Sequence, residues 1–141
     1  MKTLKNIFVF SKYPPLILGI ITAAISLLLP FIFAGILYLA GLLLGGHNEE
    51  LGNFIAYLCT GILVAVMCFF ICKAHPKSIW YTPVVCNAIT LLAGIGNYFE
   101  GNPNILMPFA VGWVFSVIAS VRGRNIGMRR KAIELAKNRP L

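Results

Sequence analysis

The residues best suited to holding a metal ion are His47, Glu49 and Glu50, which stand close together in a short polar stretch. Glu100 lies in a second polar stretch further along the chain. Imidazole nitrogens and carboxylate oxygens are the groups with which proteins bind divalent cations. Two adjacent glutamates need not converge on one ion, however, and solvated loops account for all four residues. We therefore predict no metal site and no cofactor, and name these four residues as the only candidate ligands.

The cysteines are the other residues whose spacing suggests chemistry. Quinone-coupled thiol oxidoreductases with four membrane helices use a Cys-x-x-Cys pair near a membrane face. The closest pair here, Cys68 and Cys72, has three intervening residues, and on one helix a disulfide between successive turns is strained. Cys59 and Cys86 are isolated in the sequence. We predict that all four cysteines are small, buried, apolar residues, and the resemblance to those enzymes ends at the number of helices.

Other catalytic patterns are absent from the sequence. It contains neither a nucleophile beside a histidine nor paired carboxylates within an apolar segment, and it has no phosphate-binding loop. Small multidrug transporters couple to protons through a glutamate in their first membrane helix, but residues 16–44 here include no acidic side chain. We predict that the protein is not an enzyme and not a carrier of that design.

The elements that position these residues are four long apolar segments. Hydrophobic residues make up 59% of the chain and charged residues only 11%, a composition outside the range of soluble domains. Continuous apolar runs, without strand-like alternation, cross a bilayer as helices. The sequence therefore predicts an all-α integral membrane protein, a bundle of four transmembrane helices within residues 14–122, at about residues 16–44, 54–72, 79–99 and 105–121.

The first segment is longer than a membrane requires. As a straight helix, residues 16–44 would extend about 44 Å, whereas the hydrocarbon core of a bilayer is about 30 Å thick. Pro30 stands at its middle and cannot donate a backbone hydrogen bond. We predict a kink or break near Pro30.

The positive charges predict the orientation in the membrane. The formal charge is +8, and the lysines and arginines fall before the first segment, between the second and third, and after the fourth. By the positive-inside rule both termini are cytoplasmic, including residues 1–13 and the basic tail 123–141. We predict a multi-pass protein of a bacterial plasma (inner) membrane that binds no nucleic acid. Five cations of the tail are expected to bind anionic lipids or a protein partner at the cytoplasmic face: Arg122, Arg124, Arg129, Arg130 and Lys131.

The third and fourth segments contain small and polar residues at helical spacing. In the third, Asn87 is expected near the midplane, facing other helices, and the stripe continues through Thr90, Gly94 and Asn97. Such a stripe indicates a packing seam, or alternatively the wall of a narrow hydrated path. In the fourth, a neighbouring backbone could approach one face, which carries Gly112, Ser116 and Ser120.

These observations favour a protein that acts by helix packing, as an accessory or assembly subunit of a larger membrane complex. One alternative is a homo-oligomeric channel or carrier for a small ion or neutral solute. Another is an immunity protein against a pore-forming toxin. In each case the partners are the lipid bilayer and other membrane proteins or further copies of the chain.

Overall fold

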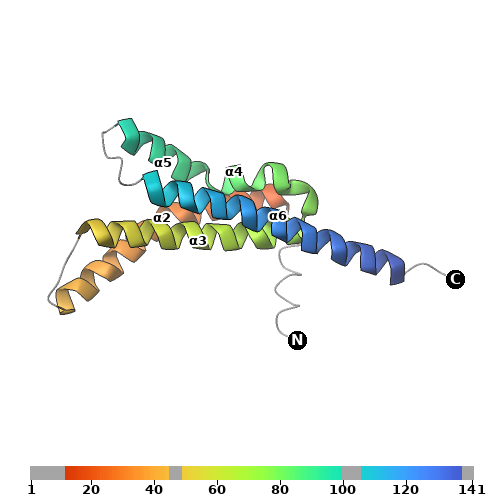
Figure 1. Ribbon diagram of the computed structural model, residues 1–141, viewed down its shortest axis with the longest axis horizontal. Helices are drawn as coiled ribbons and strands as arrows, with labels where there is room; N and C mark the ends of the chain where they lie inside the picture. The colour runs from red at the N-terminus through yellow and green to blue at the C-terminus, as the bar shows by residue number, and fades with distance from the viewer. Residues whose placement is uncertain (1–11, 45–48, 100–105, 138–141) are drawn as a thin grey trace.

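The computed structural model describes residues 12–44, 49–99 and 106–137, and all of its regular structure is helical, with no β-strand in these ranges. The long helices are α2 (Pro15–Leu44), α3 (Glu49–Ala74) and α6 (Leu106–Lys137). Between α3 and α6 lie the 3-10 helix η1 (Pro76–Trp80) and the shorter helices α4 (Thr82–Cys86) and α5 (Ala88–Phe99). The chain reverses direction after α2, after α3 and after α5, so α3 and α6 run parallel (Figure 1).

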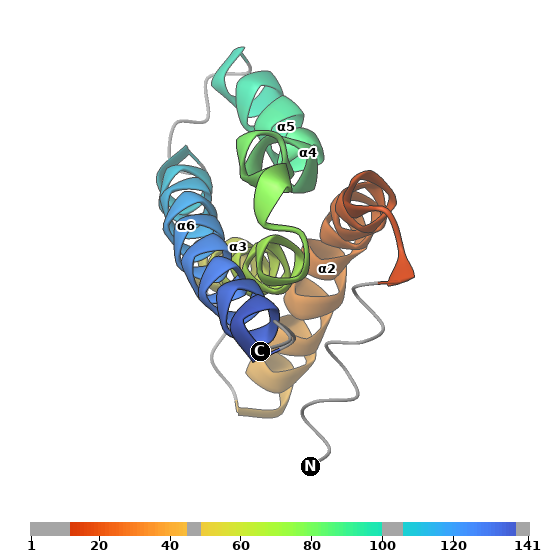
Figure 2. The same ribbon diagram turned by 90° about the vertical axis from the view of Figure 1, so that its right-hand side faces the viewer.

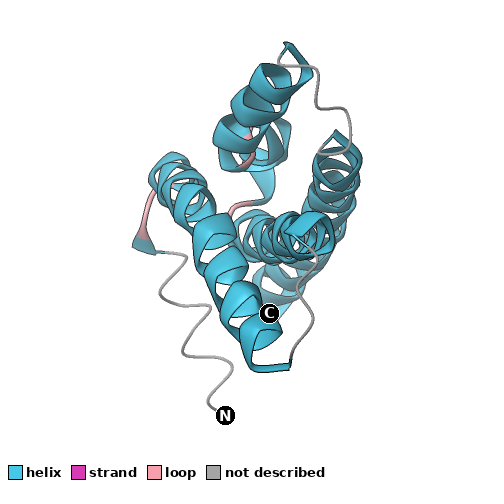
Figure 3. Cartoon of the chain, turned by 90° about the vertical axis from the view of Figure 1, so that its left-hand side faces the viewer, coloured by secondary structure: helices cyan, strands magenta, loops and turns pink. Residues whose placement is uncertain are grey.

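Helix α3 is the centre of the bundle. It contacts α2, α6, η1 and α4, and the contact with α6 is the most extensive. Figure 2 shows α3 between α6 and α2, with α4 and α5 on the third side. Figure 3 shows the same grouping of helices from the opposite end.

Two of the described helices are long and apolar enough to cross a membrane. They are α2, over Pro15–Leu43, and α3, over Leu51–Ala74, each with a mean hydropathy of 2.6. The predicted helical fold is confirmed at this level.

Pro30 does not interrupt α2. The helix continues from Pro15 to Leu44 with Pro30 inside it, so the predicted break is absent, while the predicted kink stays a prediction. A proline removes a single donor, and a long apolar helix keeps its remaining backbone bonds on both sides of that position.

The third apolar segment differs from the predicted continuous helix 79–99. It consists of η1, α4 and α5, and both η1 and α4 have a proline, Pro76 and Pro83, in their first turn. Proline is favoured there because its fixed φ suits a helix start, where its missing N–H is not needed. Asn87 ends α4 with φ −100° and ψ 6°, and its carbonyl accepts the first bond of the next helix from the Leu91 N–H at 2.8 Å.

The fourth segment is longer than predicted. We expected a membrane helix ending at residue 121 and a separate tail from residue 123, but α6 continues without interruption to Lys137. The expected boundary therefore lies inside a helix, for a reason found in its contacts with α3.

The core is narrow and made of medium-sized and small side chains. Val64, Cys68 and Ile71 of α3 pack with Cys86 of α4, and Leu18 of α2 covers the cluster. Many large apolar side chains instead face outward, among them Phe31 (74% exposed) and Leu43 (78% exposed). Close packing of helix backbones, more than a large hydrophobic core, stabilises a bundle of this kind.

Candidate functional site

The most extensive helix contact in the structure joins α3 to α6 along a row of small residues. We call this row the α3–α6 seam. It comprises Gly61, Ala65, Cys68 and Cys72 of α3 and Gly112, Ser116, Ser120, Gly123 and Gly127 of α6.

At one end of the seam the two backbones touch directly. A Cβ added to Gly61 would lie 2.9 Å from the Gly112 Cα, and one added to Gly112 would lie 3.0 Å from the Gly61 Cα. Real Cβ atoms essentially never approach within 3.0 Å, so a side chain at Gly61 requires the helices to shift, and one at Gly112 requires α3 to give way by a few tenths of an ångström. Glycine at both sites is what allows this crossing.

At the other end, two glycines of α6 rest on the backbone of α3. A Cβ on Gly123 would collide with the carbonyl oxygen of Phe69, and one on Gly127 with the carbonyl oxygen of Lys73. The Gly127 position is also closed by the Pro76 ring, whose Cγ would lie 3.0 Å away. These contacts hold the first part of the predicted tail inside the bundle, which is why α6 does not end at residue 121.

Sequence reasoning missed Gly123 and Gly127, although a signal was available. The spacing Gly123-x-x-x-Gly127 is the same small-residue device as Gly112, Ser116 and Ser120. Arginines surround the two glycines, and such positive charge is typical of a segment at the lipid surface, not of a contact between helices.

The serines of the seam are fully buried, yet their hydroxyls serve their own helix. The Ser116 Oγ donates to the Gly112 carbonyl at 2.8 Å, and the Ser120 Oγ donates to the Ser116 carbonyl at 2.8 Å. Ser120 also lies beside the thiols of Cys68 and Cys72. Both hydroxyls are thus bonded within α6, and the Ser120 hydroxyl in addition meets the two thiols across the seam, so small size is the main property that the packing uses.

Asn87 is 4% exposed, and its side chain is likewise satisfied locally. Its Nδ2 donates to the Pro83 carbonyl at 2.8 Å, within the turn that ends α4, and its burial agrees with the prediction that it faces other helices. The Thr90 hydroxyl donates to the Asn87 carbonyl at 2.8 Å. The polar groups of this stripe thus stabilise the junction of α4 and α5.

The other two residues of the predicted stripe are Gly94 and Asn97. Gly94 is buried, and a Cβ there would lie 3.2 Å from the Phe109 ring, so it is a packing position between α5 and α6. The side chain of Asn97 lies outside the described residues.

The candidate metal ligands are not brought together in the described part of the chain. His47 and Glu100 lie outside it, and Glu49 and Glu50 begin α3 with side chains that are also outside it. In the described ranges no group of three or more His, Cys, Asp or Glu residues is placed to hold a metal ion.

Three of the four cysteines are fully buried. Cys68, Cys72 and Cys86 are 0% exposed, while Cys59 is partly exposed, and all four thiols are free. Cys68 and Cys86 pack in the apolar core.

The five tail cations lie on the second half of α6, where they are divided between two faces. Arg122 and Arg129 line one shallow hollow, and Arg124 and Lys131 line another beside η1. Arg130 forms an ion pair with Glu134, with 3.8 Å between Nε and Oε1.

Comparison of the chain with protein-family profiles, with curated proteins and with solved structures finds no match. The fold alone therefore defines the class of protein: its described part is all-helical, with two helices long and apolar enough to cross a membrane.

Proposed function

We propose that this chain is an integral membrane protein that crosses a bacterial plasma membrane four times, with both termini in the cytoplasm. The third crossing would be η1, α4 and α5 together, and the fourth the uncharged first half of α6. Lys73, Lys77 and the basic half of α6 lie at one end of the bundle, which supports a single cytoplasmic face.

Within that membrane, we propose a non-enzymatic role as an accessory or assembly subunit that acts through helix packing. The observation that carries the proposal is the exposure of the side chains of α2 after Pro30. No side chain from Phe31 to Leu43 is buried, although the first half of the same helix buries Thr22, Ala23 and Ser26.

Gly35 marks a place for another helix on this surface. A Cβ added there would meet no atom within 4 Å, in contrast to the glycines of the α3–α6 seam. Glycine costs a helix about 1 kcal/mol relative to alanine, so its presence in a position without contacts fits an approach by a further backbone.

Native mass spectrometry of the tagged protein, extracted from its own membrane in a mild polymer, tests the proposal. We expect a complex that contains a second, different membrane protein. A monomer carrying only lipid would contradict the assembly role, and a defined homo-oligomer would replace it with the channel or carrier alternative.

Two matched glycine variants locate the contact. We expect Gly35→Leu to remove the partner, because the new side chain would fill the space for the partner's backbone. Gly96→Leu is the control, since Gly96 of α5 also has no atom within 4 Å of an added Cβ. Loss of the partner in both variants, or in neither, would contradict an interface on the second half of α2.

A further inference from the structure

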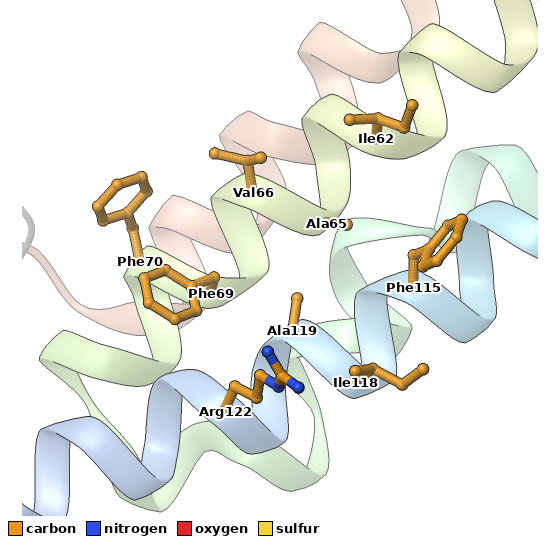
Figure 4. A pocket seen from close by; sticks show the side chains of 9 residues that line it. All are labelled: Ile62, Ala65, Val66, Phe69, Phe70, Phe115, Ile118, Ala119 and Arg122. Atoms are coloured by element: carbon orange, nitrogen blue, oxygen red, sulfur yellow. The ribbon is translucent and has the colours of Figure 1, made fainter.

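An apolar groove runs along the outside of the α3–α6 seam. Its walls include Ile62, Val66 and Phe69 of α3 and Phe115 and Ile118 of α6, and Arg122 is its one charged residue. Figure 4 shows side chains of the two helices along the groove, with Arg122 at the end near Phe69. The volume is about 600 Å³, within the range of about 300–1,000 Å³ usual for ligand sites.

The groove opens sideways, away from the bundle. Ile62, Val66, Phe115 and Ile118 are each between 44% and 49% exposed, so an occupant would enter from the surrounding hydrocarbon. A long, open, apolar wall of this kind fits a flexible hydrocarbon chain.

Cations continue the groove at its charged end. Arg122 also lines the adjoining hollow with Asn125 and Arg129, which follow it on the same face of α6. From α3, Lys73 places its Nζ 5.6 Å from the centre of the Phe69 ring, a wall of the groove. Charges from both helices therefore meet where the apolar wall ends.

These cations have no carboxylate partner in the described part of the chain. Glu134 is the acidic residue of α6, and its ion pair is with Arg130, not with Arg122 or Arg129. A cation beside hydrocarbon is stabilised by an anion, and the phosphates of membrane lipids supply one at this depth.

We propose that this groove is a specific site for an anionic phospholipid, with one acyl chain along Ile62, Val66 and Phe115 and the phosphate held by Arg122 and Arg129. The proposal rests on the proposed membrane placement but not on a protein partner. The site would join α3 to α6 at the end of the bundle where their glycine contacts also lie.

Native mass spectrometry of the full-length protein, titrated with phosphatidylglycerol or phosphatidylcholine in detergent, tests the site. We expect one phosphatidylglycerol molecule to be retained more strongly than phosphatidylcholine. Arg122→Gln with Arg129→Gln should weaken that retention about 25-fold, because each cation near an anionic lipid contributes about fivefold. Ala119→Phe, which fills the groove without changing the charge, should also lower it.

Matched variants separate a site from general attraction to a basic helix. Arg124→Gln with Lys131→Gln removes the same charge from the other face of α6 and should leave retention unchanged. Ala110→Phe adds the same ring at an exposed position of α6 outside the groove and should also be silent. Circular dichroism establishes that each variant folds, and if Ala119→Phe does not fold, the paired charge variants decide alone.

Equal weakening by the two charge pairs would overturn the proposal in favour of non-specific electrostatics, as would equal retention of both lipids. Release of the wild-type protein from membranes by alkaline carbonate would instead contradict the membrane placement itself. Failure to find a protein partner, with lipid retention intact, would affect only the assembly role.

Discussion

The α3–α6 seam and the second half of α2 both contain glycines, in opposite surroundings. In the seam, Gly61 and Gly112 bring two backbones into contact. In α2, Gly35 lies in a helix surface where the structure places no neighbour. A glycine in an apolar helix therefore has no single structural role, because that role depends on whether another backbone packs against it.

The two regions also differ in how much they stabilise the bundle. The seam contributes internal cohesion, since its small residues permit dispersion contacts along two parallel helices. The second half of α2 has no fully buried side chain and remains available for lipid or for another protein. Substitutions in the two regions should therefore have effects of different size and sign.

The largest effect is expected from Gly123→Leu. The new side chain would collide with the backbone of α3 at Phe69, which cannot move away as a side chain could. We expect a loss of about 3 kcal/mol or more in the free energy of unfolding, measured by denaturation in mixed micelles. Gly35→Leu is the control, and a loss of similar size there would remove the distinction between the two regions.

A smaller loss, about 2 kcal/mol, is expected from Gly61→Ala, because one methyl group would lie 2.9 Å from the Gly112 Cα. Gly112→Ala should cost a similar amount. The double variant should cost less than the sum, since helices separated by the first methyl group leave room for the second. Strict additivity in the same unfolding assay would show that the two glycines do not share a contact.

Gly35→Ala should change stability in the opposite direction. Its added methyl group meets nothing within 4 Å, and alanine favours the helix by up to about 1 kcal/mol. The isolated protein should become slightly more resistant to unfolding. A clear destabilisation of the isolated chain would indicate that the second half of α2 already has an internal neighbour.

The smallest effect is expected from Ser120→Ala, at about 0.5 kcal/mol or less. The Ser120 hydroxyl donates to the Ser116 carbonyl of its own helix. When the hydroxyl is removed, that carbonyl still accepts its backbone hydrogen bond within α6. Ser120→Leu should be far more damaging, because the site is fully buried. If alanine and leucine were equally damaging, the hydroxyl rather than the size of serine would be essential.

Parts of the seam could be predicted from the sequence, and other parts could not. The spacing of Gly112, Ser116 and Ser120 placed them on one face, but the partner face on α3 depends on how the helices cross. The sequence predicts that Asn87 faces other helices, and it is buried, but the acceptor of its Nδ2 is the Pro83 carbonyl in the turn before it. Periodicity indicates which residues share a face and says nothing of which acceptor an amide will choose.

By itself, the sequence determined that this protein is helical and strongly apolar, because its long uncharged runs lack the alternation of strands. Of the four membrane helices that it predicts, the structure shows two that are long and apolar enough to cross a membrane. Only the tertiary structure decided that α6 continues to Lys137 and that the third segment is divided at Asn87. The first depends on Gly123 and Gly127 meeting the backbone of α3, and the second on a local turn between helices that both pack in the bundle. Composition determines the environment of a helix, while its length and its neighbours follow from contacts between residues far apart in the chain.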